Sequence, residues 1–140
     1  MAYFGQEHFL RAELKGGLDS KPYLDALANN LLFSRAKGID KVLNEHKLDA
    51  LVAPSGGPAW LTDFIKGDAS GGGFSSPAAV AGYPHVTVPA GHVFGLPCGI
   101  SFVGTAWSEP TLIRLAYAFE QATMHRRAPT FAKSLNQLSA

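Results

Sequence analysis

The chain has 140 residues, which is enough for one hydrophobic core and too few for two ordinary domains. Its formal net charge is +1 with His neutral, so no strong field would attract nucleic acid or an anionic membrane surface. Cys98 is the single cysteine, which excludes an internal disulfide, and no apolar run approaches the roughly 18 residues of a membrane span. We therefore expect one cytoplasmic domain over residues 1–140, with no nucleic-acid or membrane partner.

The first third of the chain has the pattern of helices. Residues 3–14 carry apolar side chains at rough helical spacing, and two glycines after them end this segment. From Ser20, which offers an N-cap, apolar residues recur at three- and four-residue steps as far as Leu43. This pattern predicts a long amphipathic helix, in which we expect Gly38 to cost about 1 kcal/mol relative to Ala.

Three short apolar runs predict strands in the rest of the chain. Residues 49–54 end at a proline, as expected of a buried strand. Residues 85–89 and 99–103 are separated by glycines and a proline, which favours a turn and an antiparallel pair. A last helix begins after Ser108 and ends before Pro129. Helices, then strands, then a helix indicate a layered α/β fold.

A loop rich in Gly and Ser, residues 55–77, follows the first predicted strand and contains the run Ser70-Gly-Gly-Gly-Phe-Ser-Ser-Pro77. No Gly-Lys-Ser/Thr follows this run, so it fails the pattern of a phosphate-binding loop. Lys66 lies nearby in sequence and could activate a nucleophilic serine, although no further partner is evident. The third interpretation is a structural or pocket-lining loop, which is the usual role of such segments.

The histidines and the cysteine form no recognisable site. The five histidines show no HExxH or Cys/His spacing, so we expect no metal ion and no cofactor. Cys98 lies between a proline and a glycine at the start of a strand, where a lone cysteine is usually a small buried apolar residue.

Much of the sequence nevertheless resembles the late region of bacterial amidase signature enzymes. The resemblance is carried by residues 71–84 (GGGFSSPAAVAGYP), 86–91 (VTVPAG), 95–102 (GLPCGISF) and 107–110 (WSEP). Upstream, residues 3–7 (YFGQE) and 48–54 (LDALVAP) also fit. The resemblance therefore covers nearly the whole chain, as far as about residue 129.

The resemblance implies a fold, and it implies where in the protein the catalytic residues lie. Amidase signature enzymes are α/β/α sandwiches around a mixed sheet, and this chain would be the C-terminal portion. They hydrolyse amides, or transfer ammonia in tRNA amidation, with a Ser–cis-Ser–Lys triad and no metal. The triad lies in an upstream Gly/Ser signature that this chain lacks, so we expect no catalytic residue here. The resemblance implies instead that Gly72, Gly73, Ser75 and Ser76 line part of the substrate pocket.

Two functions from different classes remain open. In the first, the chain is the C-terminal portion of an amidase, inactive alone, which meets a small amide substrate only together with the N-terminal half. In the second, it is a stand-alone, non-catalytic module with an amidase-like fold. A piece taken from a larger sheet leaves an edge strand and apolar surface uncovered. Both hypotheses therefore predict a homo-oligomer.

Overall fold

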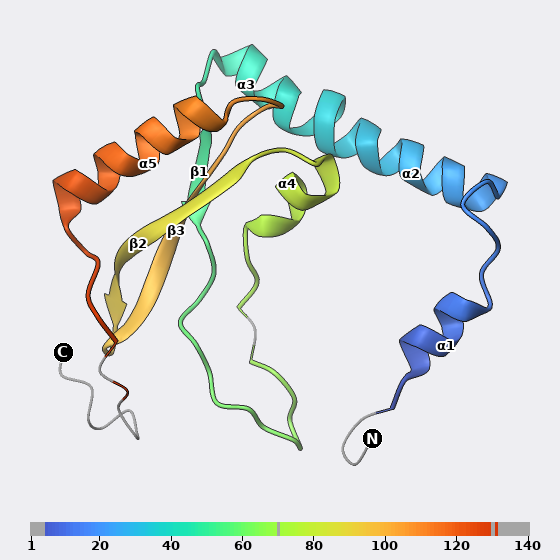
Figure 1. Ribbon diagram of the computed structural model, residues 1–140, viewed down its shortest axis with the longest axis horizontal. Coiled ribbons are helices and arrows are strands. Elements are labelled where there is room, and N and C mark those ends of the chain that lie inside the picture. Colours follow the sequence, from blue (N-terminus) through green and yellow to red (C-terminus); the bar gives the residue numbers. More distant parts are fainter. Residues whose placement is uncertain (1–4, 70, 130, 132–140) are drawn as a thin grey trace.

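The computed structural model contains a three-stranded sheet with helices on both faces, and it describes residues 5–69, 71–129 and 131. In chain order the elements are α1 (Glu7–Glu13), α2 (Lys21–Ser34), the kinked segment η1 (Arg35–Ile39), α3 (Asp40–His46), β1 (Leu51–Pro54), α4 (Ser75–Ala81), β2 (His85–Val93), β3 (Leu96–Val103) and α5 (Glu109–Thr123). This mixture of helices and strands confirms the predicted α/β class (Figure 1).

The sheet has the order β1-β3-β2, with β3 in the centre and antiparallel to both neighbours. The antiparallel pair expected from the sequence is therefore present, and its strands are longer than expected. They meet at a tight hairpin in which Phe94 has φ 49° and Gly95 has φ 75°. Two successive positive φ angles are typical of the turns that match the twist of a hairpin.

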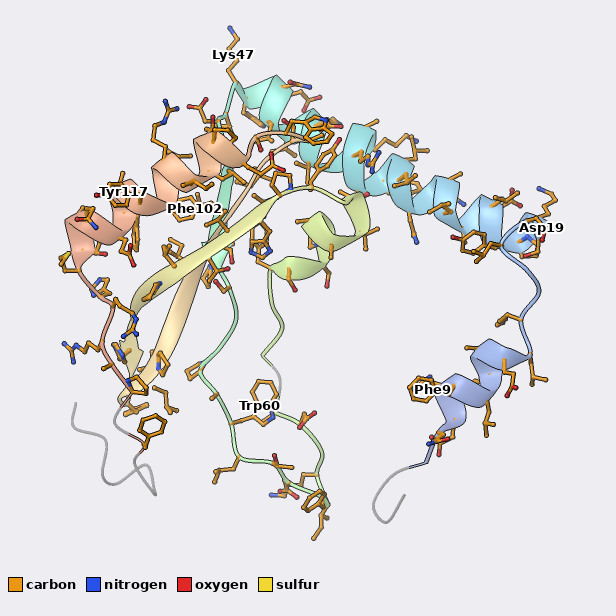
Figure 2. All side chains as sticks on the ribbon, in the orientation of Figure 1. Phe9, Asp19, Lys47, Trp60, Phe102 and Tyr117 are labelled. Atoms are coloured by element: carbon orange, nitrogen blue, oxygen red, sulfur yellow. The ribbon has the colours of Figure 1, made fainter. Side chains whose placement is uncertain are left out.

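Alternating residues of the central strand serve two hydrophobic cores. Phe102 packs with Leu112 and Ala116 of α5 on one face of the sheet (Figure 2). Val103 points to the opposite face of the sheet, where it packs against residues of η1, α3 and α4. Because side chains of a strand alternate between the two faces, one short strand can anchor helices on both sides. The other members of this second core are Ile39, Leu43, Ala78 and Ala81.

The long amphipathic helix exists but bends where η1 joins α2 to α3 (Figure 1). Gly38 has φ −119° and ψ −108°, which is not a helical conformation. A Cβ atom at this position would collide with the carbonyl oxygen of Phe33. The expectation that alanine would be better than Gly38 was therefore wrong, because the kink leaves no room for a side chain.

The predicted loop ends earlier than expected, because α4 begins at Ser75. Pro77 lies in the first turn of α4, where its missing N–H costs no helical hydrogen bond. Ala78 and Ala81 are fully buried, so packing against the neighbouring helix stabilises this short element. Gly82 ends the helix with φ 66°, a left-handed cap that glycine adopts without strain.

Two parts of the chain lie away from the sheet. α1 has no buried residue, and Phe9 on it is 73% exposed (Figure 2). The loop between β1 and α4 also extends away from the sheet (Figure 1). Within this loop, the indole N–H of Trp60 donates to Asp68 Oδ1 at 3.1 Å. β1 is an edge strand in which Val52 is 52% exposed, so it is less buried than the sequence led us to expect.

None of the described helices is both long and apolar enough to cross a bilayer.

Candidate functional site

A hollow of about 440 Å³ lies where the end of β1 meets the segment that leads into α4. Its walls are mostly glycine, so main-chain groups rather than long side chains form much of its surface. The lining residues are Ala53, Pro54, Gly56, Gly57, Gly71, Gly72, Gly73 and Phe74. None of these described lining residues carries a charge.

Main-chain contacts join the two sides of this hollow. Gly56 and Gly73 form an antiparallel β-bridge, and the Phe74 N–H donates to the Ser55 carbonyl oxygen at 3.2 Å. A Cβ atom on Gly73 would lie 3.0 Å from that same oxygen, so a larger residue would push the segments apart. Gly72 has φ 81°, a left-handed conformation that favours glycine. Gly73 is therefore needed for the close approach of the two segments, and Gly72 for the left-handed turn of the backbone.

Between the lining residues Pro54 and Gly56, Ser55 takes part in a cluster of three hydroxyl groups on one face of the sheet. Ser101 in β3 is fully buried, and its Oγ lies 2.7 Å from Ser55 Oγ and 3.0 Å from Thr87 Oγ1. Thr87 Oγ1 also lies 3.4 Å from His85 Nε2. We missed this cluster in the sequence. The signal available in the sequence was a hydroxyl residue between apolar neighbours in each of two predicted strands, namely Thr87 and Ser101, which pair in the sheet.

The four residues predicted to line a substrate pocket separate into two pairs. Gly72 and Gly73 line the hollow. Ser75 and Ser76 form the first turn of α4, are exposed, and are not among the lining residues. Contact of any of the four with a substrate stays a prediction.

The hypothesis of a serine activated by Lys66 gains no support from the described residues. The backbone N–H groups of Ile65 and Lys66 donate to Asp63 Oδ1 at 2.8 and 3.0 Å, which forms a local turn. The hydrogen bond from the Lys66 N–H, and to a smaller extent that from the Ile65 N–H, lowers the pKa of the Asp63 carboxyl. In the part of the chain that the structure describes, the Lys66 side chain makes no hydrogen bond to a serine.

The cysteine and the histidines also stay apart. Cys98 is a free, half-buried thiol in β3. His85 is half-buried beside Thr87, while His92 is exposed near the hairpin. Over residues 5–69, 71–129 and 131, no three His, Cys, Asp or Glu side chains are grouped as a metal site would require.

A second polar cluster holds α4 and the following turn against the bent helix. Arg35 donates from Nε to the Ala81 carbonyl at 2.7 Å, and its guanidinium lies 5.3 Å from the centre of the Tyr83 ring. The Tyr83 hydroxyl donates to Asp40 at 2.8 Å. Burial raises the pKa of the Tyr83 hydroxyl, and the hydrogen bond to Asp40 raises it further. These contacts connect η1 and α3 to the end of α4, so they support the hollow indirectly.

Comparison with curated proteins shows extensive similarity to amidases. The chain is 43% identical over 129 residues to a probable amidase of Arabidopsis thaliana, an alignment that covers 91% of this chain and 22% of that protein. It is 35% identical over 127 residues to one component of the glutamyl-tRNA(Gln) amidotransferase of Methanosarcina barkeri, covering 83% of this chain and 25% of that component. No protein-family model matches the chain.

Comparison with solved structures also finds amidases. The native peptide amidase of Stenotrophomonas maltophilia superposes with a TM-score of 0.83 at 46% identity, over 93% of this chain and 26% of that one. Peptide amidase PAM, in complex with the competitive inhibitor chymostatin, gives a TM-score of 0.90 at 48% identity, over 94% of this chain and 27% of that one. This chain is a homologue of amidase signature proteins.

The homology confirms the resemblance found in the sequence and the fold class that it implied. The chain spans about a quarter of the length of the relatives it matches, with shares of 22% and 25% for the two curated proteins above. Three quarters of an amidase signature protein therefore have no counterpart in these 140 residues.

Proposed function

We propose that this chain is the C-terminal portion of an amidase, an enzyme that hydrolyses amide C–N bonds, and that it supplies part of the fold and one wall of the substrate pocket. The observation that carries this proposal is the 43% identity to a probable amidase over 91% of the chain. The glycine-walled hollow beside Phe74 is the structural feature that supports the proposed pocket wall.

In this proposal the bond-breaking groups come from outside the chain. Amide hydrolysis by a serine needs a nucleophile with an adjacent base, and donors for the oxyanion. The hydroxyls of Ser75 and Ser76 make no hydrogen bond to a Lys or His within the described residues. We therefore assign no catalytic residue here and place the Ser–cis-Ser–Lys triad in the rest of an amidase.

The hollow favours an uncharged substrate group. Its described lining residues carry no charge, and its glycines bring main-chain groups rather than long side chains to its surface. A buried charge without a partner is costly, so a neutral amide with its own N–H and C=O groups fits better than a charged chain. A peptide amide meets this requirement, which agrees with the name of the peptide amidase that the chain resembles.

The purified chain should release no ammonia from aliphatic, aromatic or peptide amides. Loss of a complete nucleophilic apparatus costs on the order of 10⁶ in rate in other serine hydrolases, which would leave no turnover above background. Ammonia would be measured with and without the chain, and with Ser75→Ala and Ser76→Ala variants. Turnover that disappears in either variant would show that catalysis resides in this segment.

The alternative function is a stand-alone, self-associating module. It is favoured by the apolar side chains that the described helices leave exposed, among them Leu24 at 49% and Ile113 at 59%. Both alternatives propose a homo-oligomer for the isolated chain. The cytoplasmic location expected from the lone cysteine stays a prediction.

A further inference from the structure

A buried serine in the middle of the sheet needs a reason, because burying a hydroxyl is unfavourable unless it is hydrogen-bonded. Ser101 is fully buried in β3, the central strand. Its Oγ lies 2.7 Å from Ser55 Oγ and 3.0 Å from Thr87 Oγ1, and the Ser55 and Thr87 hydroxyls are 3.5 Å apart. The three side chains therefore form a closed hydroxyl network that joins β2, β3 and the residue that directly follows β1.

Gly99 makes room for this network. A Cβ atom at Gly99 would lie 2.8 Å from Ser55 Oγ and 2.8 Å from Thr87 Cγ2, so those two side chains occupy its place. The Gly99 carbonyl also accepts the Ser55 N–H at 2.8 Å. Ser55 is thus held to β3 by its main chain and by its side chain.

The network connects to the wall of the hollow by two separate routes. Along the main chain, the Ser55 carbonyl accepts the Phe74 N–H at 3.2 Å. Through side chains, Thr87 Oγ1 lies 3.4 Å from His85 Nε2, and the His85 ring meets the Phe74 ring edge-on with their centres 6.3 Å apart. Both the backbone and the ring of Phe74 are therefore in contact with groups that the network positions.

We propose that the hydroxyl network of Ser55, Thr87 and Ser101 fixes the wall formed by residues 71–74 against the sheet, and so sets the shape of the hollow that receives the substrate. The three residues are positioning residues, which act through Phe74 and the glycines and do not touch the reacting atoms. The role in substrate binding rests on the proposed amidase function, whereas the positioning of the wall does not.

The test is residue-resolved amide hydrogen exchange on the complete chain. The reporter is the Phe74 amide, and the reference is the Leu112 amide, which donates to Ser108 at 3.0 Å in α5. Thr87→Val keeps the shape of the side chain and removes the hydroxyl, and Thr87→Ser keeps the hydroxyl. Thr87 is exposed, so neither change threatens the fold.

We expect exchange at Phe74 to become about 5- to 10-fold faster in Thr87→Val, which corresponds to the loss of one ordinary hydrogen bond. Thr87→Ser should restore the exchange rate of the original chain, and Leu112 should be unaffected in both variants. Ser34→Ala, which removes a hydroxyl bonded to Asn30 far from the network, is the matched control.

Three results, of two kinds, would overturn the proposal. One is an unchanged Phe74 rate in Thr87→Val. The other is equal acceleration at Phe74 and Leu112, or a failure of Thr87→Ser to restore the rate, since either would mean general destabilisation. No amidase activity enters this measurement, so its outcome is independent of whether the proposed function holds.

Discussion

At the scale of single residues, the glycines of this chain have different physical roles that composition alone hides. Gly99 is a glycine because two side chains fill the space beside it. Gly57, by contrast, has nothing within 4 Å of the place that a Cβ atom would take. It is an exposed residue of the glycine-walled hollow. The two positions therefore differ in what an added methyl group would do.

Gly99→Ala should lower the free energy of unfolding by about 1–3 kcal/mol, because overpacking forces neighbouring side chains or backbone to move. Gly57→Ala should be neutral, or stabilising by up to about 1 kcal/mol through reduced entropy of the unfolded chain. Urea unfolding followed by circular dichroism compares the two. Equal midpoints for both variants would contradict the role assigned to Gly99.

Tyr83 gives the fold a dependence on alkaline pH. Burial and the hydrogen bond to Asp40 raise its pKa above the ordinary 10.0, so the folded chain favours the neutral phenol. The resulting stabilisation is complete below the unfolded pKa and is lost as the pH rises through the folded pKa. Unfolding of the original chain and of Tyr83→Phe, measured at pH 8 and pH 11, should show the larger alkaline loss in the original chain. Equal losses would exclude this contribution.

At the scale of elements, the bent helix α2-η1-α3 sets the position of α4. Ile39 and Leu43 lie just beyond the kink, and both pack with the buried alanines of α4. A straight helix would carry these two side chains away from Ala78 and Ala81. The kink at Gly38 is therefore a condition for the core beneath the bent helix.

Gly38→Ala should destabilise the chain by about 1–3 kcal/mol, which is opposite to the helix propensities of the two residues. Ala28→Gly in α2 is the matched control, and there glycine should cost about 1 kcal/mol in the ordinary direction. Thermal or urea unfolding measures both. A stabilising Gly38→Ala would mean that the helix straightens freely and that the bend has no structural role.

The sequence predicted the elements that have a strong period and missed those that depend on tertiary contacts. The hairpin and α5 follow from apolar runs bounded by turn and capping residues. α4 was missed because three glycines followed by Ser-Ser-Pro are typical of a loop. The helix is stabilised by tertiary packing of Ala78 and Ala81, which the local sequence does not show. The hydroxyl network was missed for the same reason, since the contact of Ser55 with Ser101 joins residues 46 positions apart.

At the scale of the whole molecule, the described chain leaves much apolar surface uncovered. Leu24 and Leu27 on α2 are 49% and 40% exposed, and Ile113 and Tyr117 on α5 are 59% and 61% exposed. Exposed apolar groups of this extent commonly mark interaction surfaces. In the full-length relatives, three quarters of the protein are available to cover them.

The isolated chain should therefore self-associate, most simply as a twofold dimer that buries about 800 Å² per partner. Light scattering coupled to gel filtration over a tenfold range of concentration would measure it. Ile113→Glu with Tyr117→Lys should shift the equilibrium toward monomer, whereas Lys15→Glu, a change at a charged and exposed position outside α2 and α5, should not. A single monomer peak for the original chain at every concentration would show that these surfaces need no partner.

We propose that these 140 residues form about one quarter of an amidase and complete its pocket. The most direct test replaces the matching segment of the Stenotrophomonas maltophilia peptide amidase with this chain and measures ammonia release from a peptide amide. The same enzyme with that segment deleted is the control. We predict that the chimera releases ammonia while the deletion and the isolated chain do not. A chimera that folds as a monodisperse protein and releases no ammonia would contradict the claim.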